Sequence, residues 1–313
     1  MLRRSSHQRL RNELVASLGL LAIVALVPLA VSNDYWLGVL IVSMYFAMLA
    51  GGWNLLAGYT GQFSLAPATF AMLGAYGTGL LAYHWQVSPW LSIPAGVIVA
   101  AVIGMALGRI VMRLRGPYLA LTTLSFAEIM RIVIGNSYEF TRGDLGLSVP
   151  SLTEDRLIWY YLFVAVVVLM QLGLYALLKS RAGLYLMAIR DDEIGAASRG
   201  VDTVFWKTAS FTMSTAVSGL AGVMYAHFSE LVSPELGLIL QTGLVICMVF
   251  IGGIASLVGP IIGAFLVYLS SEALREVGGI QLIVFAILVI LIARFFREGL
   301  WGVARRILER GAA

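Results

Sequence analysis

Long apolar runs separated by short polar connections extend over most of the chain. A helix needs roughly 20 predominantly apolar residues to cross the hydrocarbon core of a bilayer, and the runs approach that length. The first run follows a basic segment and ends at Val31, and the others cover 36–57, 65–83, 89–112, 117–135, 157–178, 208–229, 237–254, 260–275 and 279–296. The pattern predicts an all-α polytopic membrane protein with about ten transmembrane helices.

The first run is interpreted as an uncleaved helix, because no small-residue cleavage site follows it and the next run begins at once. Ten crossings from an N-terminus inside the cell would place four basic segments in the cytoplasm. These are the tail at 1–13, the turn after Arg109, the loop at 179–207 and the tail at 297–313. Most of the 21 lysine and arginine residues fall in these segments. Since cytoplasmic loops carry the basic excess, both termini are predicted to be cytoplasmic, with the transmembrane domain at 14–296.

The loop at 179–207 is a long polar island, with nine charged residues between two apolar runs. Asp191 and Asp192, followed by Gly200, predict a short helix with an acidic N-terminal cap and a glycine stop. A compact helix between two spans can serve as a docking surface for a partner. The alternative is a solvated loop whose charges only keep it out of the lipid.

A second unusual stretch, 51–67, interrupts an apolar run with glycines, a proline and the polar residues Asn54, Gln62 and Ser64. Backbone groups cannot remain unpaired in lipid, so irregular backbone at that depth must line a cavity or be buried in protein. The alternative is an ordinary tight turn between the second and third spans.

Short internal similarities accompany this stretch. Gly61-Gln-Phe-Ser-Leu-Ala-Pro67 is echoed by Gly253-Ile-Ala-Ser-Leu-Val-Gly-Pro260, which hints at an internal repeat of the kind that transporters often contain. Pairs of small residues such as Gly104 and Gly108 would let neighbouring helices approach closely.

Glu128 and Arg131 are three residues apart on one predicted helix face. Either charge alone costs roughly 2.5 to 3.5 kcal/mol at the centre of a membrane helix, so the two are predicted to pair. A structural ion pair near the outer interface is favoured over a role in binding substrate, since a long arginine there can extend to the headgroups.

The composition agrees with a membrane protein and excludes several functions. Apolar residues make up 60% and charged residues 12% of the chain, against about 25% charged in a soluble domain. Cys247 is the one cysteine, and the three histidines have no ligand spacing, so neither a disulfide framework nor a metal site is predicted. The sequence pI of about 9.3 is attributed to the basic cytoplasmic segments rather than to nucleic-acid binding.

No nucleotide-binding or catalytic pattern is present. The two lysines, Lys179 and Lys207, do not lie in a Gly-x-x-x-x-Gly-Lys-Ser/Thr sequence, so any ATP must be bound by another subunit. An integral-membrane enzyme lacks a catalytic constellation here, and a stand-alone secondary carrier lacks a series of buried coupling carboxylates.

Five ordered motifs resemble one family, the LivM-type permease subunits of bacterial branched-chain amino-acid ABC importers. They lie at 58–65, 115–131, 188–201, 233–235 and 251–263. The resemblance implies an ABC importer permease fold in the bacterial inner membrane and transport of leucine, isoleucine or valine into the cell. Closely similar subunits carry urea, amides or other small organic solutes, so the substrate stays open among these classes.

The resemblance also implies partners: a LivH-like second permease, two ATP-binding cassette subunits, a periplasmic substrate-binding protein and membrane lipid. No fused ATPase domain follows at the C-terminus, so ATP and Mg²⁺ are expected in separate subunits, with no cofactor in this chain. The longest outer connection, 136–156, is the predicted outer face for a partner.

Two sets of functional residues are predicted. The resemblance makes the 190–201 helix the element that couples to the ATPase, with its small alanine face in the partner groove, although Ser198-Arg199 departs from the family pattern. The coupling residues are Arg190, Asp191, Asp192, Glu193, Ala196, Ala197, Arg199 and Gly200. Small polar groups, which can pass a zwitterion without holding it, are predicted to border the translocation pathway. They and the charged pair are Asn54, Gln62, Ser64, Thr122, Thr123, Glu128 and Arg131.

Overall fold

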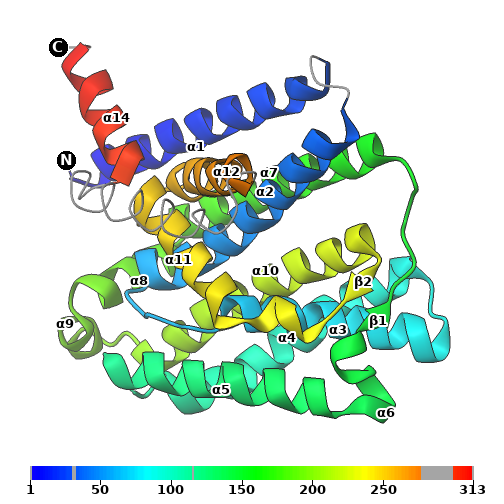
Figure 1. Ribbon diagram of the computed structural model, residues 1–313. Coiled ribbons are helices and arrows are strands. Elements are labelled where there is room, and N and C mark those ends of the chain that lie inside the picture. Colours follow the sequence, from blue (N-terminus) through cyan, green and yellow to red (C-terminus); the bar gives the residue numbers. More distant parts are fainter. Residues whose placement is uncertain (1, 30–32, 115, 276–298, 312–313) are drawn as a thin grey trace. The chain divides into compact units, whose positions relative to one another are not determined.

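The computed structural model describes residues 2–29, 33–114, 116–275 and 299–311, and most of them lie in helices (Figure 1). The chain forms two compact units. Unit 1 comprises Met1–Asn54, Arg156–Lys179 and Leu244–Ala313, and unit 2 comprises Leu55–Asp155 and Ser180–Gly243. Each unit is therefore assembled from segments that are distant in the sequence.

Unit 1 is a helical bundle centred on α2. This helix packs against α7 and α12, and α7 also packs against α1. The residues of α2 are apolar on all sides, as expected for a helix in the interior of a bundle, and almost all of them are buried. The helices of unit 1 are α1 (Leu2–Leu26), η1 (Val27–Leu29), α2 (Asp34–Asn54), α7 (Arg156–Lys179), most of α11 (Ile239–Gly252), α12 (Gly259–Ala273) and α14 (Gly299–Gly311).

Unit 2 is organised around α10, which packs along α3 and α4. Glycines allow these contacts, as the small-residue pairs predicted. A β-carbon added at Gly222 would lie 1.9 Å from the Ala71 carbonyl oxygen, and one at Gly104 would lie 2.0 Å from the Thr215 hydroxyl oxygen. The helices are η2 (Leu55–Tyr59), α3 (Pro67–Trp85), α4 (Pro89–Val111), α5 (Pro117–Asn136), α6 (Tyr138–Thr141), η3 (Gly143–Leu145), α8 (Arg181–Asp191), α9 (Glu193–Ser198), α10 (Thr203–Ser229) and η4 (Pro234–Gly237).

A small antiparallel pairing joins two connections of unit 2. Strand β1 (Leu147–Ser148) pairs with β2 (Leu231–Val232), with Leu147 opposite Val232. This pairing interrupts the otherwise all-helical architecture, and β1 lies within the 136–156 connection. The nearby His227 is fully buried, with its Nδ1 atom 2.7 Å from the Pro150 carbonyl oxygen and its Nε2 atom 2.8 Å from the Thr78 hydroxyl.

The predicted spans up to 260–275 all coincide with helices, and the segment 279–296 lies outside the described residues. Among the described helices, α2, α4, α5, α7 and the run from Leu10 to Leu29 are long and apolar enough to cross a membrane. The helices α11 and α12 are shorter than predicted. With 14 and 15 residues they rise about 21 and 22 Å, less than the roughly 30 Å of a hydrocarbon core.

Candidate coupling and translocation site

The polar island contains two helices, α8 and α9, rather than one. The predicted helix over 190–201 is wrong at its start, because Arg190 and Asp191 belong to the end of α8. The cap is Asp192, whose side chain accepts a hydrogen bond of 3.0 Å from the Gly195 backbone N–H and so starts α9. The predicted glycine stop is confirmed, since Gly200 follows α9 with a φ of +84°.

A partly buried ion pair joins α9 to the start of α10. The Lys207 ammonium lies 3.0 Å from a Glu193 carboxylate oxygen, and the Lys207 side chain is only 1% exposed. Removing Glu193 would leave the buried Lys207 charge without compensation, which is destabilising. Glu193 therefore holds α9 against α10, and α9 is not solvated on all sides.

The outward surface of α9 differs from the predicted alanine face. Ala196 is 5% exposed and packs inward, so Ala196 and Ala197 cannot both face a partner. Ala197 is exposed, and Ile194, three residues earlier on the same helix face, is 69% exposed. Ile194 and Ala197 form an exposed apolar face, which we call the α9 face. Sequence reasoning missed Ile194, although an isolated isoleucine among charged residues was the available signal.

Arg190 connects α8 to the irregular segment that follows α2 along the chain. Its Nη1 donates a hydrogen bond of 3.2 Å to the Gly58 carbonyl oxygen, and its guanidinium also lies 2.9 Å from Asp191. At Gly61, which has a φ of +73°, an added β-carbon would lie 3.1 Å from Cγ of Arg190. Only glycine gives Arg190 this close an approach to the backbone.

Asp192 and Arg199 are both exposed, and the described structure shows no side-chain partner for Arg199.

The irregular segment itself, residues 55–66, is largely buried within unit 2. Its first part, η2, is a wide π-helical turn, which is a rare form found mostly as single turns in helices and often at functional sites. Thr60 lies 2.7 Å from the Ser210 hydroxyl on α10, and the Leu65 backbone N–H donates to Thr123 on α5 over 2.9 Å. The prediction that 51–67 is irregular backbone buried in protein is confirmed from Leu55 onward, and an ordinary tight turn is excluded.

The predicted pathway residues do not form one cluster. Gln62, Ser64 and Thr123 come together around the irregular segment, with Ser64 accepting a hydrogen bond of 3.3 Å from the Ala66 N–H. Thr122 points away from Thr123, because successive helix positions are about 100° apart, and its hydroxyl bonds the Tyr118 carbonyl oxygen on its own helix.

The other pathway residues lie elsewhere. Asn54 belongs to unit 1, where its side-chain amide donates to the Ser256 carbonyl oxygen over 2.8 Å and accepts from the Ala255 N–H over 2.8 Å. Glu128 and Arg131 form the predicted pair, with a hydrogen bond of 3.1 Å from the arginine Nε and a second one from Nη2. Both charged side chains are partly exposed and lie off the buried face of α5. In the described ranges, no group of histidine, cysteine or acidic residues could hold a metal ion.

Comparison with protein families matches residues 35–293 to the branched-chain amino acid transport system permease component. The match covers most of the chain. The chain belongs to this family. It is therefore a permease subunit of a transport system and a multi-pass protein of the inner membrane.

Individual family members show the same relationship. The LivM permease protein of the high-affinity branched-chain amino acid transport system of Escherichia coli K12 is 30% identical over 94% of this chain and 78% of its own length. The LivM protein of Salmonella typhimurium LT2 is also 30% identical, over 93% of this chain and 76% of its own length. The LivH permease protein of Escherichia coli K12 is 25% identical over 80% of this chain and 91% of its own length. The similarity thus extends to both permeases named for that system.

Proposed function

We propose that this permease subunit moves leucine, isoleucine or valine from the periplasm to the cytoplasm in an ATP-driven importer. Its partners are a LivH-like permease, two ATP-binding cassette subunits that bind ATP and Mg²⁺, and a periplasmic binding protein. The chain itself performs no covalent chemistry. The proposed topology has ten spans and two cytoplasmic tails, at 1–13 and 297–313, around a transmembrane domain at 14–296.

The contact between Arg190 and Gly58 carries the coupling part of this proposal. The cytoplasmic ATPase would bind the exposed α9 face, and α9 is held to α10 by the partly buried Glu193–Lys207 pair. A displacement of α8 and α9 would then reach the irregular segment 55–66 through the Arg190 guanidinium. A hydrogen bond to a charged group contributes about 1.5 to 3 kcal/mol, enough to bias two arrangements of that segment.

The irregular segment is the proposed border of the translocation pathway, together with Gln62, Ser64 and Thr123. Its backbone leaves the helical hydrogen-bonding pattern while most of its residues are buried in protein. Single cysteines at these three positions, in a chain without Cys247, should become accessible to a thiol reagent in at least one nucleotide state. Inaccessibility in every state would remove them from the pathway.

The coupling proposal is tested by Arg190→Ala in the complete complex reconstituted in proteoliposomes with its binding protein. ATP-driven leucine uptake should fall about ten-fold or more, because the charged hydrogen bond to Gly58 is lost, while ATPase subunits still assemble. Arg199→Ala is the matched control, since Arg199 is an exposed arginine at the end of the neighbouring helix α9 and has no described side-chain partner. Equal uptake by the two variants would exclude the Arg190 connection. Uptake of urea or an amide in place of leucine would change the proposed substrate and leave the connection intact.

A further inference from the structure

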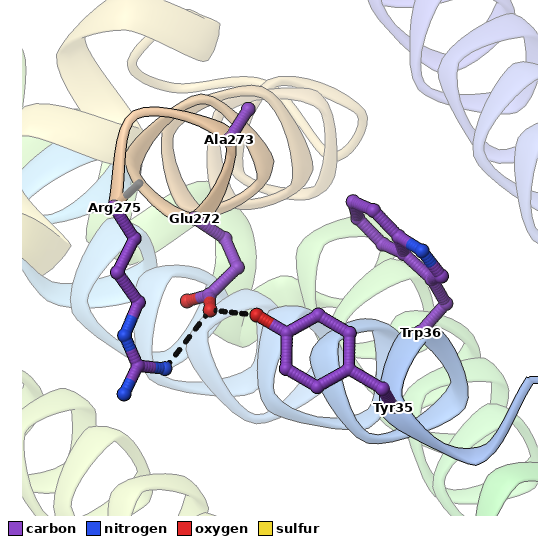
Figure 2. A pocket seen from close by; sticks show the side chains of 5 residues that line it. All are labelled: Tyr35, Trp36, Glu272, Ala273 and Arg275. Atoms are coloured by element: carbon purple, nitrogen blue, oxygen red, sulfur yellow. Dashed lines mark hydrogen bonds and ion pairs between the residues drawn. The ribbon is translucent and has the colours of Figure 1, made fainter. Parts of the chain in front are cut away.

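A cavity of about 590 Å³ lies in unit 1 at the ends of two helices. Tyr35 and Trp36 come from the first turn of α2, and Glu272, Ala273 and Arg275 come from the end of α12 and just beyond it. Figure 2 shows the Glu272 carboxylate between the Arg275 guanidinium and the Tyr35 hydroxyl, with the Trp36 ring on the far side of Tyr35. The volume falls within the range of roughly 300 to 1,000 Å³ typical of pockets for small molecules.

The polar groups of this cavity are only partly used. One oxygen of Glu272, Oε1, accepts hydrogen bonds from both the Tyr35 hydroxyl and Nη1 of Arg275, the latter over 3.0 Å. Among the described residues, no hydrogen bond reaches the other oxygen, Oε2, and Arg275 interacts otherwise only with the Tyr35 hydroxyl, so most of its N–H groups are open. The Glu272 side chain is 11% exposed, and that of Arg275 is 68% exposed. The Glu272 carboxylate, which is fixed by hydrogen bonds, and the exposed Arg275 guanidinium therefore line the same cavity.

The free groups have opposite charges, and their chemistry selects a ligand that carries both. Carboxylate oxygens accept from an ammonium, and the planar guanidinium donates to a carboxylate or phosphate with two parallel N–H groups. We propose that this cavity binds a zwitterion in which a primary ammonium and an oxyanion are a few atoms apart. The ammonium would meet Oε2 of Glu272, and the oxyanion would meet Arg275. A simple cation or anion would satisfy one group and be repelled by the other.

Two sources supply this chemistry at a membrane surface: the phosphatidylethanolamine headgroup and a free amino acid. Trp36 is 42% exposed and Tyr35 is 49% exposed, and half-exposed Trp and Tyr side chains are typical of the headgroup region of a membrane protein. The proposed topology places these helix ends on the periplasmic side, where substrate arrives. The amino-acid source rests on the proposed function, whereas the lipid source does not.

The test uses the full chain with its co-purified subunits in nanodiscs, and lipid that stays bound is counted by native mass spectrometry. Discs of phosphatidylethanolamine are compared with discs of phosphatidylcholine, whose quaternary ammonium has no N–H to donate, and of phosphatidylglycerol, which has no ammonium. Glu272→Gln and Arg275→Gln should each reduce retained phosphatidylethanolamine several-fold. Glu235→Gln and Arg113→Gln, at exposed charges elsewhere, are the matched controls and should retain it.

A second arm identifies the free amino acid. Binding of radiolabelled leucine to the complex in phosphatidylcholine discs is measured without ATP and without the binding protein. Leucine binding that both cavity variants abolish, with the controls unchanged, assigns the site to the free amino acid. Selective retention of phosphatidylethanolamine assigns it to the lipid. The inference is overturned if the cavity variants match the controls for both ligands. Neither measurement uses ATP-driven uptake, so this result is independent of the outcome for Arg190.

Discussion

Two breaks in the helices share a sequence pattern but are held in different ways. One is the irregular segment 55–66 between α2 and α3 in unit 2, and the other is the connection 253–258 between α11 and α12 in unit 1. Each has a glycine with positive φ, a serine hydroxyl that accepts a hydrogen bond from a later backbone N–H, and a proline in the first turn of the next helix. These residues are Gly61, Ser64 and Pro67 in the first break and Gly253, Ser256 and Pro260 in the second.

The two breaks differ in the residues that hydrogen-bond to them. The 253–258 connection is held by Asn54, with two hydrogen bonds, and by the buried Glu13, whose carboxylate accepts from the Leu257 N–H over 3.2 Å. Both come from long helices of the same bundle. The 55–66 segment is instead held partly by Arg190, from the polar island that carries the α9 face. We call the 253–258 connection in unit 1 the fixed break, because residues of its own bundle hold it. We propose that the 55–66 segment in unit 2 moves when the ATPase displaces α9, and we call it the driven break.

Blocking the α9 face should have the largest effect on the driven break. Ala197→Trp places bulk on the exposed surface, so the subunit should still insert and pair with its permease partner. Substrate-stimulated ATP hydrolysis by the reconstituted complex should be abolished, because overpacking of a close interface costs about 1 to 3 kcal/mol or more.

Two further variants are compared with Ala197→Trp. Ala196→Trp should fail at folding instead, since Ala196 is buried. Arg199→Ala should be mild, because exposed charge pairs contribute about 0 to 1 kcal/mol. Normal transport by Ala197→Trp, or greater damage from Arg199→Ala, would show that the ATPase binds elsewhere.

Removing the Asn54 amide should loosen the fixed break. Asn54→Leu keeps the side-chain size but leaves the buried Ser256 carbonyl and the partly buried Ala255 N–H unpaired, at up to about 1 to 3 kcal/mol each. The thermal unfolding midpoint of the purified subunit should fall by several degrees. Asn136→Leu, at an exposed position on α5, should change it little. If both variants unfold at the same temperature, the 253–258 connection does not depend on Asn54.

The substitution Gly61→Ala, compared with Gly200→Ala, distinguishes the effect of backbone strain from the effect of disturbing the Arg190 contact. Gly61→Ala and Gly200→Ala both force alanine into positive φ, at about 1 to 2 kcal/mol. Only at Gly61 would the new β-carbon meet Arg190, because nothing lies within 4 Å of that position at Gly200. Leucine uptake should therefore fall several-fold further for Gly61→Ala, and equal uptake would mean that the contact transmits nothing.

The ion pair on α5 should matter least. Glu128→Gln should lower the free energy of unfolding by less than about 1 kcal/mol, since both partners are partly exposed. Exchanging the charges, as Glu128→Arg with Arg131→Glu, should restore transport to any single variant that loses it. A defect that persists in the exchanged protein would instead indicate that each charge contacts substrate.

Much of the helix content could be read from the sequence, because apolar runs long enough to cross a bilayer must be helical there. The same argument leaves a break between the runs 237–254 and 260–275, close to the observed 253–258, but it extends α11 and α12 beyond their observed ends. It gives no sign of what holds the break, because Asn54 and Glu13 are distant in the sequence. The β1–β2 pairing was also missed, since two residues per strand give no alternation to detect.

In the candidate site, features set by neighbouring residues were predicted, and features set by residues distant in the sequence were not. The acidic cap and the glycine stop of α9 are local chemistry and were predicted, apart from a shift of the cap to Asp192. The inward position of Ala196 and the burial of Lys207 depend on how α9 lies against α10. A lysine between apolar residues and a charged loop gave no indication that it would be buried against Glu193.

The burial of Lys207 provides the protein with a built-in chemical reporter. The chain has two lysine side chains, Lys179, which is exposed, and Lys207, which is 1% exposed. While α9 is seated, an amine-reactive reagent should therefore modify Lys179 and leave Lys207 intact, without any engineered residue. The rate at which Lys207 acquires the mass tag during ATP turnover would measure how often α9 lifts from α10.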